Sequence, residues 1–165
     1  MKASTIIDAP IKTVYDALLD FDSYPTWNSY VPSVIFKGLR PPNPEIGMRF
    51  TFVAHQKRGD SGIHSAEQLT LLEPGTTTCR VAWKSAAVPS SILSAERMHE
   101  MVESIDESGK AVTSYTTWET FGGLVGWIVK LSQGQLLVDR FADWTNDLKA
   151  HVEGMLSSNS IEMCS

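Results

Sequence analysis

The sequence predicts an α+β domain in which a curved antiparallel sheet of seven strands packs against one long C-terminal helix. Two observations predict this fold. From about residue 31 to residue 120, short β-type segments alternate with turn residues. After residue 123, apolar residues recur every three or four positions, which is the helical period. Because short connections favour antiparallel neighbours, the helix must bury its apolar stripe against one face of the sheet.

The N-terminal region predicts one strand and one helix before the main run of strands. Residues 3–7 form a short β-type segment. Pro10 suits the first turn of a helix, where the missing N–H costs nothing. Apolar residues at helical spacing over residues 11–21 predict about three turns with one buried face. A turn or second short helix is expected at residues 24–28.

Six further strands are expected, each bounded by Gly, Pro, Asp or Asn residues typical of turns. A sheet of this width curls as it twists, and a single helix cannot fill its concave face. An apolar pocket between the sheet and the helix is therefore expected. The predicted strands cover residues 31–39, 48–55, 63–72, 77–85, 95–105 and 111–120.

The closing helix carries the strongest periodic pattern in the chain. Residues 124–131 extend its stripe upstream, and residues 132–134 predict either a kink or a break between two helical segments. We expect a single domain over residues 1–156, followed by a flexible tail at residues 157–165. The stripe consists of Leu137, Phe141, Trp144, Leu148, Val152 and Met155.

The composition excludes several classes of protein. The chain has 165 residues, 42% of them hydrophobic, which is enough for one core and rules out a disordered protein. Fourteen basic against nineteen acidic residues, with the basic ones scattered, argue against nucleic-acid binding and anionic membranes. The longest apolar stretch is too short to span a membrane. A monomer and a homodimer both remain open.

The two cysteines, Cys79 and Cys164, are 85 positions apart and are expected to be free thiols. The N-terminal residues do not have the pattern of a signal peptide. Together these features favour a cytoplasmic location.

Four motifs, taken in order along the chain, resemble the START-like (SRPBCC) superfamily with its helix-grip fold. The resemblance is greatest to its polyketide cyclase/dehydratase branch. The motifs are residues 7–10 (IDAP) with Val14 and Tyr15, residues 20–28 (DFDSYPTWN), residues 117–123 (TWETFGG), and the closing stripe.

This resemblance implies a hydrophobic cavity but leaves the reaction open, since the superfamily includes carriers, receptors and cyclases. Our leading hypothesis is binding of a small polyketide-like or aromatic metabolite in a biosynthetic pathway of secondary metabolism. Cofactor-free cyclisation, dehydration or isomerisation would follow, as in a lyase or isomerase. The alternative is a non-catalytic carrier of a lipid, a quinone or a similar apolar molecule.

Two neighbouring strands carry the candidate catalytic residues. Arg97 and His99 share one face of the first strand, and Tyr115 and Glu119 share one face of the next. Glu119 or His99 could accept a proton, while Arg97 or Tyr115 holds an oxyanion. The alternative is that these side chains lie on the solvated outer face of the sheet.

Large apolar side chains are the candidate ligand contacts. Aromatic rings suit a flat hydrophobic ligand, and indole N–H groups can orient it. The alternative role is in the core, which must hold for most of the tryptophans. The candidates are Trp27, Phe50, Phe52, Trp83, Met101, Phe121, Leu137, Phe141 and Trp144.

A metal site and a bound cofactor are not expected. His55 and His64 could approach each other across a hairpin, but no further ligand falls at a suitable spacing. No glycine-rich phosphate loop occurs, and Gly122 and Gly123 fit the turn from the last strand into the helix.

Overall fold

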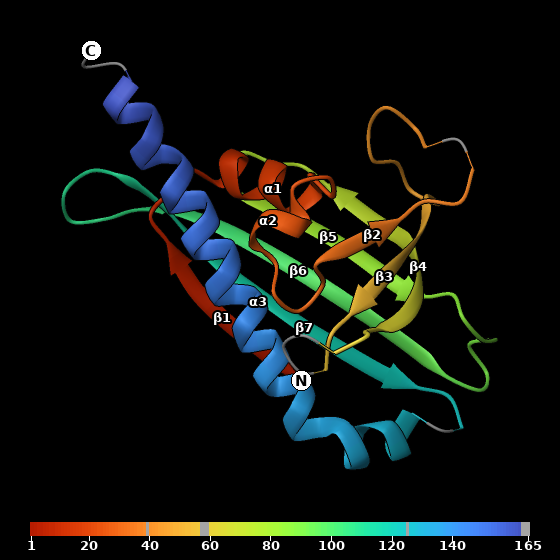
Figure 1. Ribbon diagram of the computed structural model, residues 1–165. Helices are drawn as coiled ribbons and strands as arrows, with labels where there is room; N and C mark the ends of the chain where they lie inside the picture. The colour runs from red at the N-terminus through yellow and green to blue at the C-terminus, as the bar shows by residue number, and fades with distance from the viewer. Residues whose placement is uncertain (39, 57–59, 125, 163–165) are drawn as a thin grey trace.

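The computed structural model describes residues 1–38, 40–56, 60–124 and 126–162, with the side chains of residues 126–134 and 159–162 excepted. A seven-stranded sheet forms one layer, and the long helix α3 lies across its concave face (Figure 1). The predicted α+β helix-grip architecture is confirmed. The elements are β1 (Lys2–Ile7), α1 (Ile11–Leu19), α2 (Tyr24–Trp27), β2 (Ser33–Ile35), β3 (Arg49–Ala54), β4 (Ile63–Glu73), β5 (Thr78–Ser85), β6 (Ser94–Ile105), β7 (Ala111–Gly122) and α3 (Gly126–Glu162).

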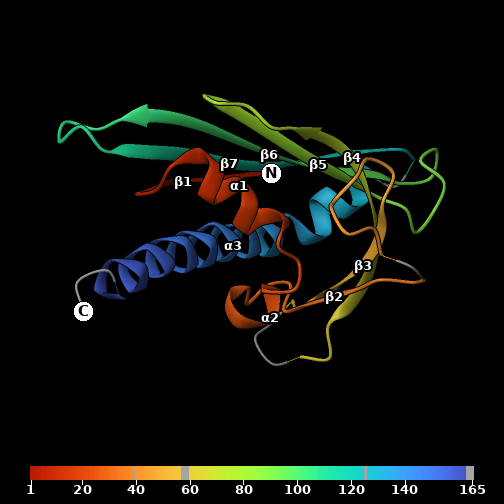
Figure 2. The same ribbon diagram turned by 90° about the horizontal axis from the view of Figure 1, so that it is seen from above.

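The strands follow the order β1-β7-β6-β5-β4-β3-β2, and every neighbouring pair is antiparallel. Strands β2 to β7 pair in sequence order, as short hairpin connections require. β1 joins the far edge by pairing with β7, with Thr5 opposite Tyr115. Figure 2 shows the sheet bent around α3, with β2 and β3 turned away from the plane of β6 and β7.

The second strand is much shorter than the expected 31–39. β2 covers only Ser33–Ile35 and pairs only with β3, so it is a short edge strand. Val31 and Pro32 precede it as irregular chain, and Pro32 cannot donate a ladder hydrogen bond. The expected end at Leu39 lies outside the described residues.

The closing helix runs without interruption from Gly126 to Glu162, so residues 132–134 do not divide it into two segments. Figure 1 shows the first part of α3 at an angle to its long straight remainder, which agrees with the expected kink. The helix also continues past the end expected at residue 156. The side chains of the upstream stripe at 126–131 and the thiol of Cys164 lie outside the described residues, whereas Cys79 is a buried free thiol.

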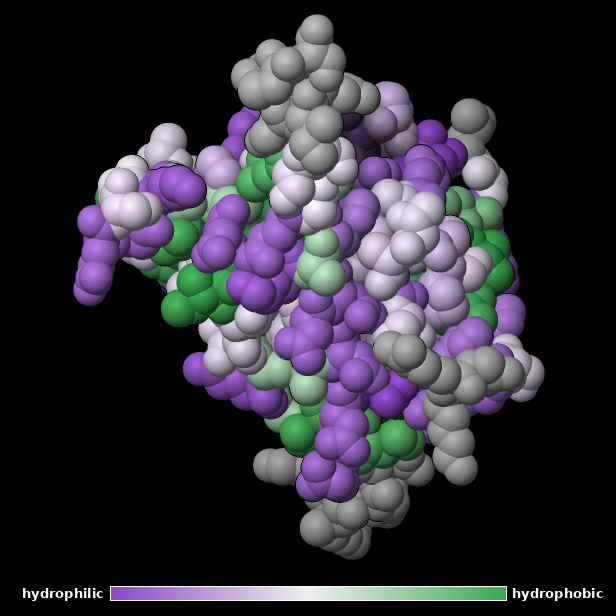
Figure 3. Space-filling model, turned by 60° about the vertical axis from the view of Figure 1, so that its left-hand side comes forward, coloured by the Kyte–Doolittle hydropathy of each residue, from purple (hydrophilic) through white to green (hydrophobic). Residues whose placement is uncertain are grey.

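The core lies between α3, α1 and the concave face of the sheet. Trp144, Leu148 and Val152 of the helical stripe are fully buried, whereas Met155 is exposed. Figure 3 shows a mostly hydrophilic surface along the outer side of α3. Among the described residues, no helix is both long enough and apolar enough to cross a membrane.

Candidate functional site

A cavity of about 280 Å³ opens between the curled half of the sheet and the early turns of α3. Strands β3 to β7 supply one wall, α3 supplies the opposite wall, and the loop after α2 closes one side. This volume is at the lower end of the range of small-molecule sites, roughly 300–1,000 Å³. A ligand that fills it is therefore small. The predicted residues that line it are Phe52, Trp83, Arg97, Glu119, Phe121 and Leu137.

The remaining predicted residues are not among those that line the cavity. Two of the candidate catalytic residues, His99 and Tyr115, lie further along the inward faces of β6 and β7 and are fully buried. Trp27 is part-buried and stacks on His151 of α3, with ring centroids 5.4 Å apart. Phe50, Met101, Phe141 and Trp144 are buried side chains of the core.

Arg97 and Glu119 face each other across β6 and β7, where their Cα atoms are register partners. Both side chains line the cavity, so their strand faces point inward rather than to solvent. The Arg97 residue is 5% exposed, and its guanidinium carbon lies 3.7 Å from the centroid of the Phe141 ring. Its Nε and Nη2 groups are buried and have no hydrogen-bond partner. Burying these donors without an acceptor from the chain is energetically costly.

Glu67 is a second cavity carboxyl, which the sequence analysis missed. It lies on β4, is 9% exposed, and accepts a hydrogen bond of 2.5 Å from the Ser65 hydroxyl. Its pKa is raised to about 7, mainly by burial; the Ser65 hydrogen bond and the charge of Arg97 oppose the rise, and the nearby Glu119 adds to it. The sequence feature that could have identified Glu67 is the period-2 alternation, which places Ser65, Glu67 and Leu69 on one face of the strand.

Burial also raises the pKa of the Glu119 carboxyl, and the positive charge of Arg97 opposes that rise. Two carboxyls with raised pKa values thus border the same apolar space. Groups with such pKa values are suited to give and take protons under physiological conditions.

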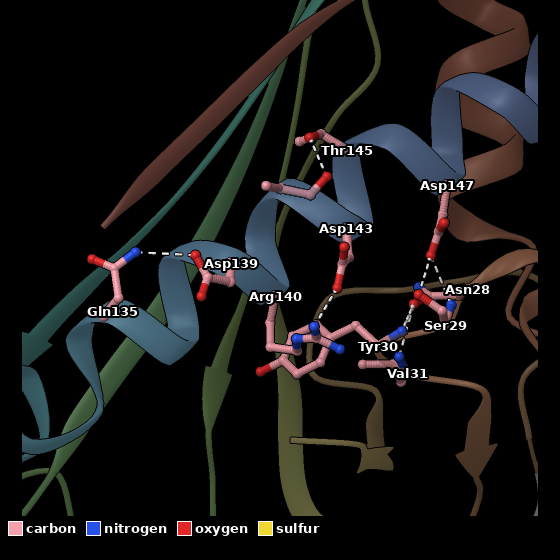
Figure 4. A network of polar contacts seen from close by, with 11 residues as sticks. Asn28, Ser29, Tyr30, Val31, Gln135, Asp139, Arg140, Asp143, Thr145 and Asp147 are labelled. Carbon is pink, nitrogen blue, oxygen red and sulfur yellow. Dashed lines mark hydrogen bonds and ion pairs between the residues drawn. The ribbon is translucent and has the colours of Figure 1, made fainter. Parts of the chain in front are cut away.

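Tyr30 is held against this cavity by a tethered loop between α2 and β2 (Figure 4). The Oδ1 atom of buried Asn28 accepts hydrogen bonds from the backbone N–H groups of Tyr30 and Val31, at 3.1 and 2.7 Å. Asp147 of α3 accepts hydrogen bonds from both the N–H and the hydroxyl of Ser29, at 2.8 and 2.6 Å. The loop is therefore fixed to α3. Sequence periodicity gave no signal for Tyr30, because it lies in neither a helix nor a strand.

Arg140 reaches the cavity from the opposite layer (Figure 4). It lies on α3, and its Nη2 atom is 2.7 Å from a carboxylate oxygen of Asp143. Its Nε and Nη1 groups are buried without a hydrogen-bond partner. Arg140 lies one helical turn after the predicted ligand contact Leu137 and therefore on the same face of α3. This spacing could have identified Arg140 as a cavity residue from the sequence.

His99 and Tyr115 form a buried pair beside the cavity. The Nδ1 atom of His99 is 2.5 Å from the Tyr115 hydroxyl, and the imidazole lies 4.2 Å from the Trp83 ring between centroids. Burial, together with the charge of Arg97, lowers the pKa of His99 well below its ordinary value. The imidazole is therefore neutral, and it supports the Trp83 wall from behind.

No cluster of three metal-ligating side chains occurs among the described residues. The Nδ1 atom of His55 is 3.9 Å from a carboxylate oxygen of Asp60, a separation too long for a hydrogen bond. His64 lies on β4 opposite Val53 and is exposed.

Comparison with solved structures supports the fold. A hypothetical protein, jhp0584, from Helicobacter pylori superposes with a TM-score of 0.69 at 14% identity, covering 92% of this chain and 86% of that one. A START superfamily protein from Mycobacterium smegmatis superposes with a TM-score of 0.62 at 11% identity, covering 94% of this chain and 97% of that one. The di-domain ARO/CYC StfQ from the steffimycin biosynthetic pathway gives 0.61 at 13% identity, covering 95% of this chain and 51% of that protein.

Sequence comparison gives the family. The chain is 27% identical over 172 residues to the oxopyrrolidines biosynthesis cluster protein O of Penicillium oxalicum, covering 92% of this chain and 85% of that protein. The family model described as polyketide cyclase/dehydrase and lipid transport matches residues 1–153. The resemblance inferred from the four sequence motifs is confirmed, and the chain belongs to the polyketide cyclase/dehydrase and lipid transport family.

Proposed function

We propose that this protein binds a small polyketide-like or aromatic metabolite in its cavity and catalyses a cofactor-free cyclisation, dehydration or isomerisation. The reaction is a step of a biosynthetic pathway in the cytoplasm. A relative named for a biosynthesis cluster and the fold shared with an ARO/CYC protein support the pathway context. The family description supports the reaction class.

One observation carries the catalytic part of this proposal. Glu67 and Glu119 border the same cavity as the guanidinium of Arg97, and the pKa of both carboxyls is raised. Because a raised pKa makes a carboxyl easier to protonate, each of the two can serve as proton acceptor in one step and proton donor in another. A cavity that only binds an apolar ligand would not need two carboxyls in its wall.

The chemistry follows from this arrangement. A carboxylate takes the proton from a carbon next to a carbonyl, and the C–H electron pair moves onto the carbonyl oxygen to form an enolate. Arg97 stabilises that oxygen by charge and hydrogen bonding. The enolate carbon then attacks a second carbonyl of the same molecule, and the other carboxyl protonates the new alkoxide. Phe52, Trp83 and Phe121 position the apolar body of the substrate and exclude water.

In this scheme His99 and Tyr115 are positioning residues, since neither borders the cavity. They pack behind Trp83 and hold that wall in place.

The second candidate is a non-catalytic carrier. The family description includes lipid transport, and most of the cavity wall is apolar. The small volume favours a compact cargo, such as a quinone ring, over a long acyl chain.

Complementation of a gene deletion in the producing organism separates the two functions. The double variant Glu67→Gln/Glu119→Gln keeps the shape of the cavity but removes both carboxyls, so we expect the pathway product to stay absent and an uncyclised precursor to accumulate. The control, Glu96→Gln, changes an exposed carboxyl and should restore the product. Full restoration by the double variant would contradict catalysis and favour a carrier.

The cavity itself is tested by Ala95→Trp, which places an indole on a small lining residue. Circular dichroism verifies that this variant folds. Both the enzyme and the carrier should then fail to complement, whereas a protein that uses another surface should not be affected.

A further inference from the structure

Two arginine side chains reach the same cavity from opposite layers with N–H groups that no protein atom accepts. Arg97 extends from β6 and Arg140 from α3. The unpartnered groups are Nε and Nη2 of Arg97 and Nε and Nη1 of Arg140. Buried polar groups in native proteins are nearly always hydrogen-bonded, so these donors require an acceptor that the chain does not supply.

Packing explains why Arg97 is buried but not why its donors are free. Its guanidinium stacks over the Phe141 ring and lies 5.0 Å from the centroid of the Trp144 ring. Those contacts use the flat faces of the group. The N–H groups lie in its plane and point outward from its edge, which is the geometry that matches two oxygens of a planar anion.

The cavity carboxyls do not neutralise this charge. Among the described residues, no carboxylate lies within ion-pair distance of Arg97, although Glu119 is its cross-strand neighbour. Arg140 is paired with Asp143 through one nitrogen only. Glu67 instead takes its hydrogen bond from Ser65. The pKa of Glu67 is raised to about 7, so this carboxyl is partly neutral at physiological pH, and the pKa of Glu119 is raised as well.

Tyr30 lines the same cavity as these four charged residues. Burial raises the pKa of its phenol; Glu67 and Glu119 add to the rise, and Arg97 and Arg140 oppose it, so all four lie within electrostatic reach of this side chain. The guanidinium carbon of Arg97 is 5.5 Å from the centroid of the Tyr30 ring. The cavity therefore has a polar end built around two guanidinium groups and an apolar wall that includes Trp83 and Phe121.

We propose that the natural ligand carries a planar oxyanion, a carboxylate or an enolised 1,3-dicarbonyl group, which binds between Arg97 and Arg140. Its apolar body packs against Trp83 and Phe121. This inference rests on the proposed function only in placing the ligand in the cavity. It adds the charge of the ligand and the residues that select it, and it applies equally to an enzyme and to a carrier.

Isothermal titration calorimetry with three probes tests the proposal. Naphthalene-2-carboxylate and naphthalene-2-carboxamide have nearly the same shape and differ in charge. The diketone 1-phenylbutane-1,3-dione has no carboxyl but ionises to an enolate. Since a hydrogen bond to a charged group contributes about 1.5–3 kcal/mol, we expect the carboxylate to bind at least about ten-fold more tightly than the amide.

Matched variants assign that preference to the two arginines. Arg97→Met and Arg140→Gln should each reduce the preference for the carboxylate by about ten-fold, because each weakens binding of the carboxylate more than binding of the neutral amide. Arg49→Gln removes one positive charge from an exposed position on β3 and should leave both affinities unchanged. Because Arg140 is on the helix and Arg97 on the sheet, a folding defect in one variant does not prevent the test in the other.

The outcomes separate this inference from the proposed function. Equal affinity for the carboxylate and the amide without tight binding of the ionised diketone, or a preference for the anion that persists in both variants, overturns the inference while a cavity ligand site stands. If no probe binds, the proposed function fails as well. Tight binding of the ionised diketone together with weak binding of the carboxylate identifies an enolate as the anion, and the reverse identifies a carboxylate.

Discussion

The two ends of the interface between the sheet and α3 differ in how their polar groups are satisfied. At the closed end, the buried Tyr24 hydroxyl donates to the Leu18 carbonyl and Thr113 donates to the Ala9 carbonyl, both at 2.7 Å. At the cavity end, two residues that line the cavity, Arg97 and Arg140, carry buried N–H groups without a partner. The same two layers thus satisfy these buried hydroxyls at one end and leave guanidinium donors free at the other. The difference indicates that the cavity end is built for a ligand rather than for stability.

The two ends should differ most in how much stability is lost when a leucine of the helical stripe is truncated to alanine. Leu148 is fully buried at the closed end, whereas Leu137 borders the cavity and is only partly buried. We expect Leu148→Ala to lower the free energy of unfolding by about 3–4 kcal/mol and Leu137→Ala by about 1 kcal/mol. Urea denaturation measures both. Equal losses would mean that the cavity end is as tightly packed as the core.

The next largest effect is the pH dependence of folding stability that Glu67 causes. Its pKa is about 7 in the folded protein against an ordinary 4.5, so between these values the unfolded chain releases a proton that the folded one retains. Folding stability therefore falls as pH rises from about 4.5 to 7 and is constant above that window. Glu67→Gln removes this loss and should stabilise the protein at pH 8 by up to about 3 kcal/mol relative to wild type.

This gain should disappear toward pH 4, where the carboxyl is protonated in both states. Urea denaturation of both proteins across the pH range measures it. Glu96→Gln on the exposed face provides the control and should show no such trend. A constant difference between Glu67→Gln and wild type at all pH values would contradict the raised pKa.

The smallest effect compares one polar group from each end. Tyr24→Phe leaves the buried Leu18 carbonyl without its donor and should cost about 1 kcal/mol. Arg97→Met removes a buried charge with unpartnered donors, so the free energy of unfolding should stay the same or rise. If Arg97→Met destabilises the protein more than Tyr24→Phe does, Arg97 has a structural role, and its unpartnered N–H groups are not evidence of a ligand site.

The fold could be predicted well because its signals are periodic. Alternation in the strands and the stripe through Trp144 and Leu148 predicted both layers and their contact. The length of β2 could not be predicted, because residues 31–39 look uniformly β-type while the edge strand pairs over only three residues. The end of α3 was also predicted too early, because polar residues at a helix end resemble a tail.

The site was predicted only in part, for a geometric reason. Period 2 places Arg97 and His99 on one strand face but does not say how far along that face the cavity extends. The cavity borders Arg97, and the helix covers His99, so these neighbours differ in exposure to a ligand. The three lining residues that the sequence did not identify come from separate segments: Glu67 from β4, Tyr30 from a loop and Arg140 from α3. Only the curl of the sheet brings them together.

A ligand site at the cavity end is tested most directly by a nuclear magnetic resonance titration of the labelled protein with naphthalene-2-carboxylate. We expect backbone amide shifts to change at the cavity end, around Glu67, Arg97 and Glu119, and to stay constant at the closed end, around Tyr24 and Leu148. Shift changes centred on the closed end or on the outer face of the sheet, or no changes at saturating probe concentration, would contradict it.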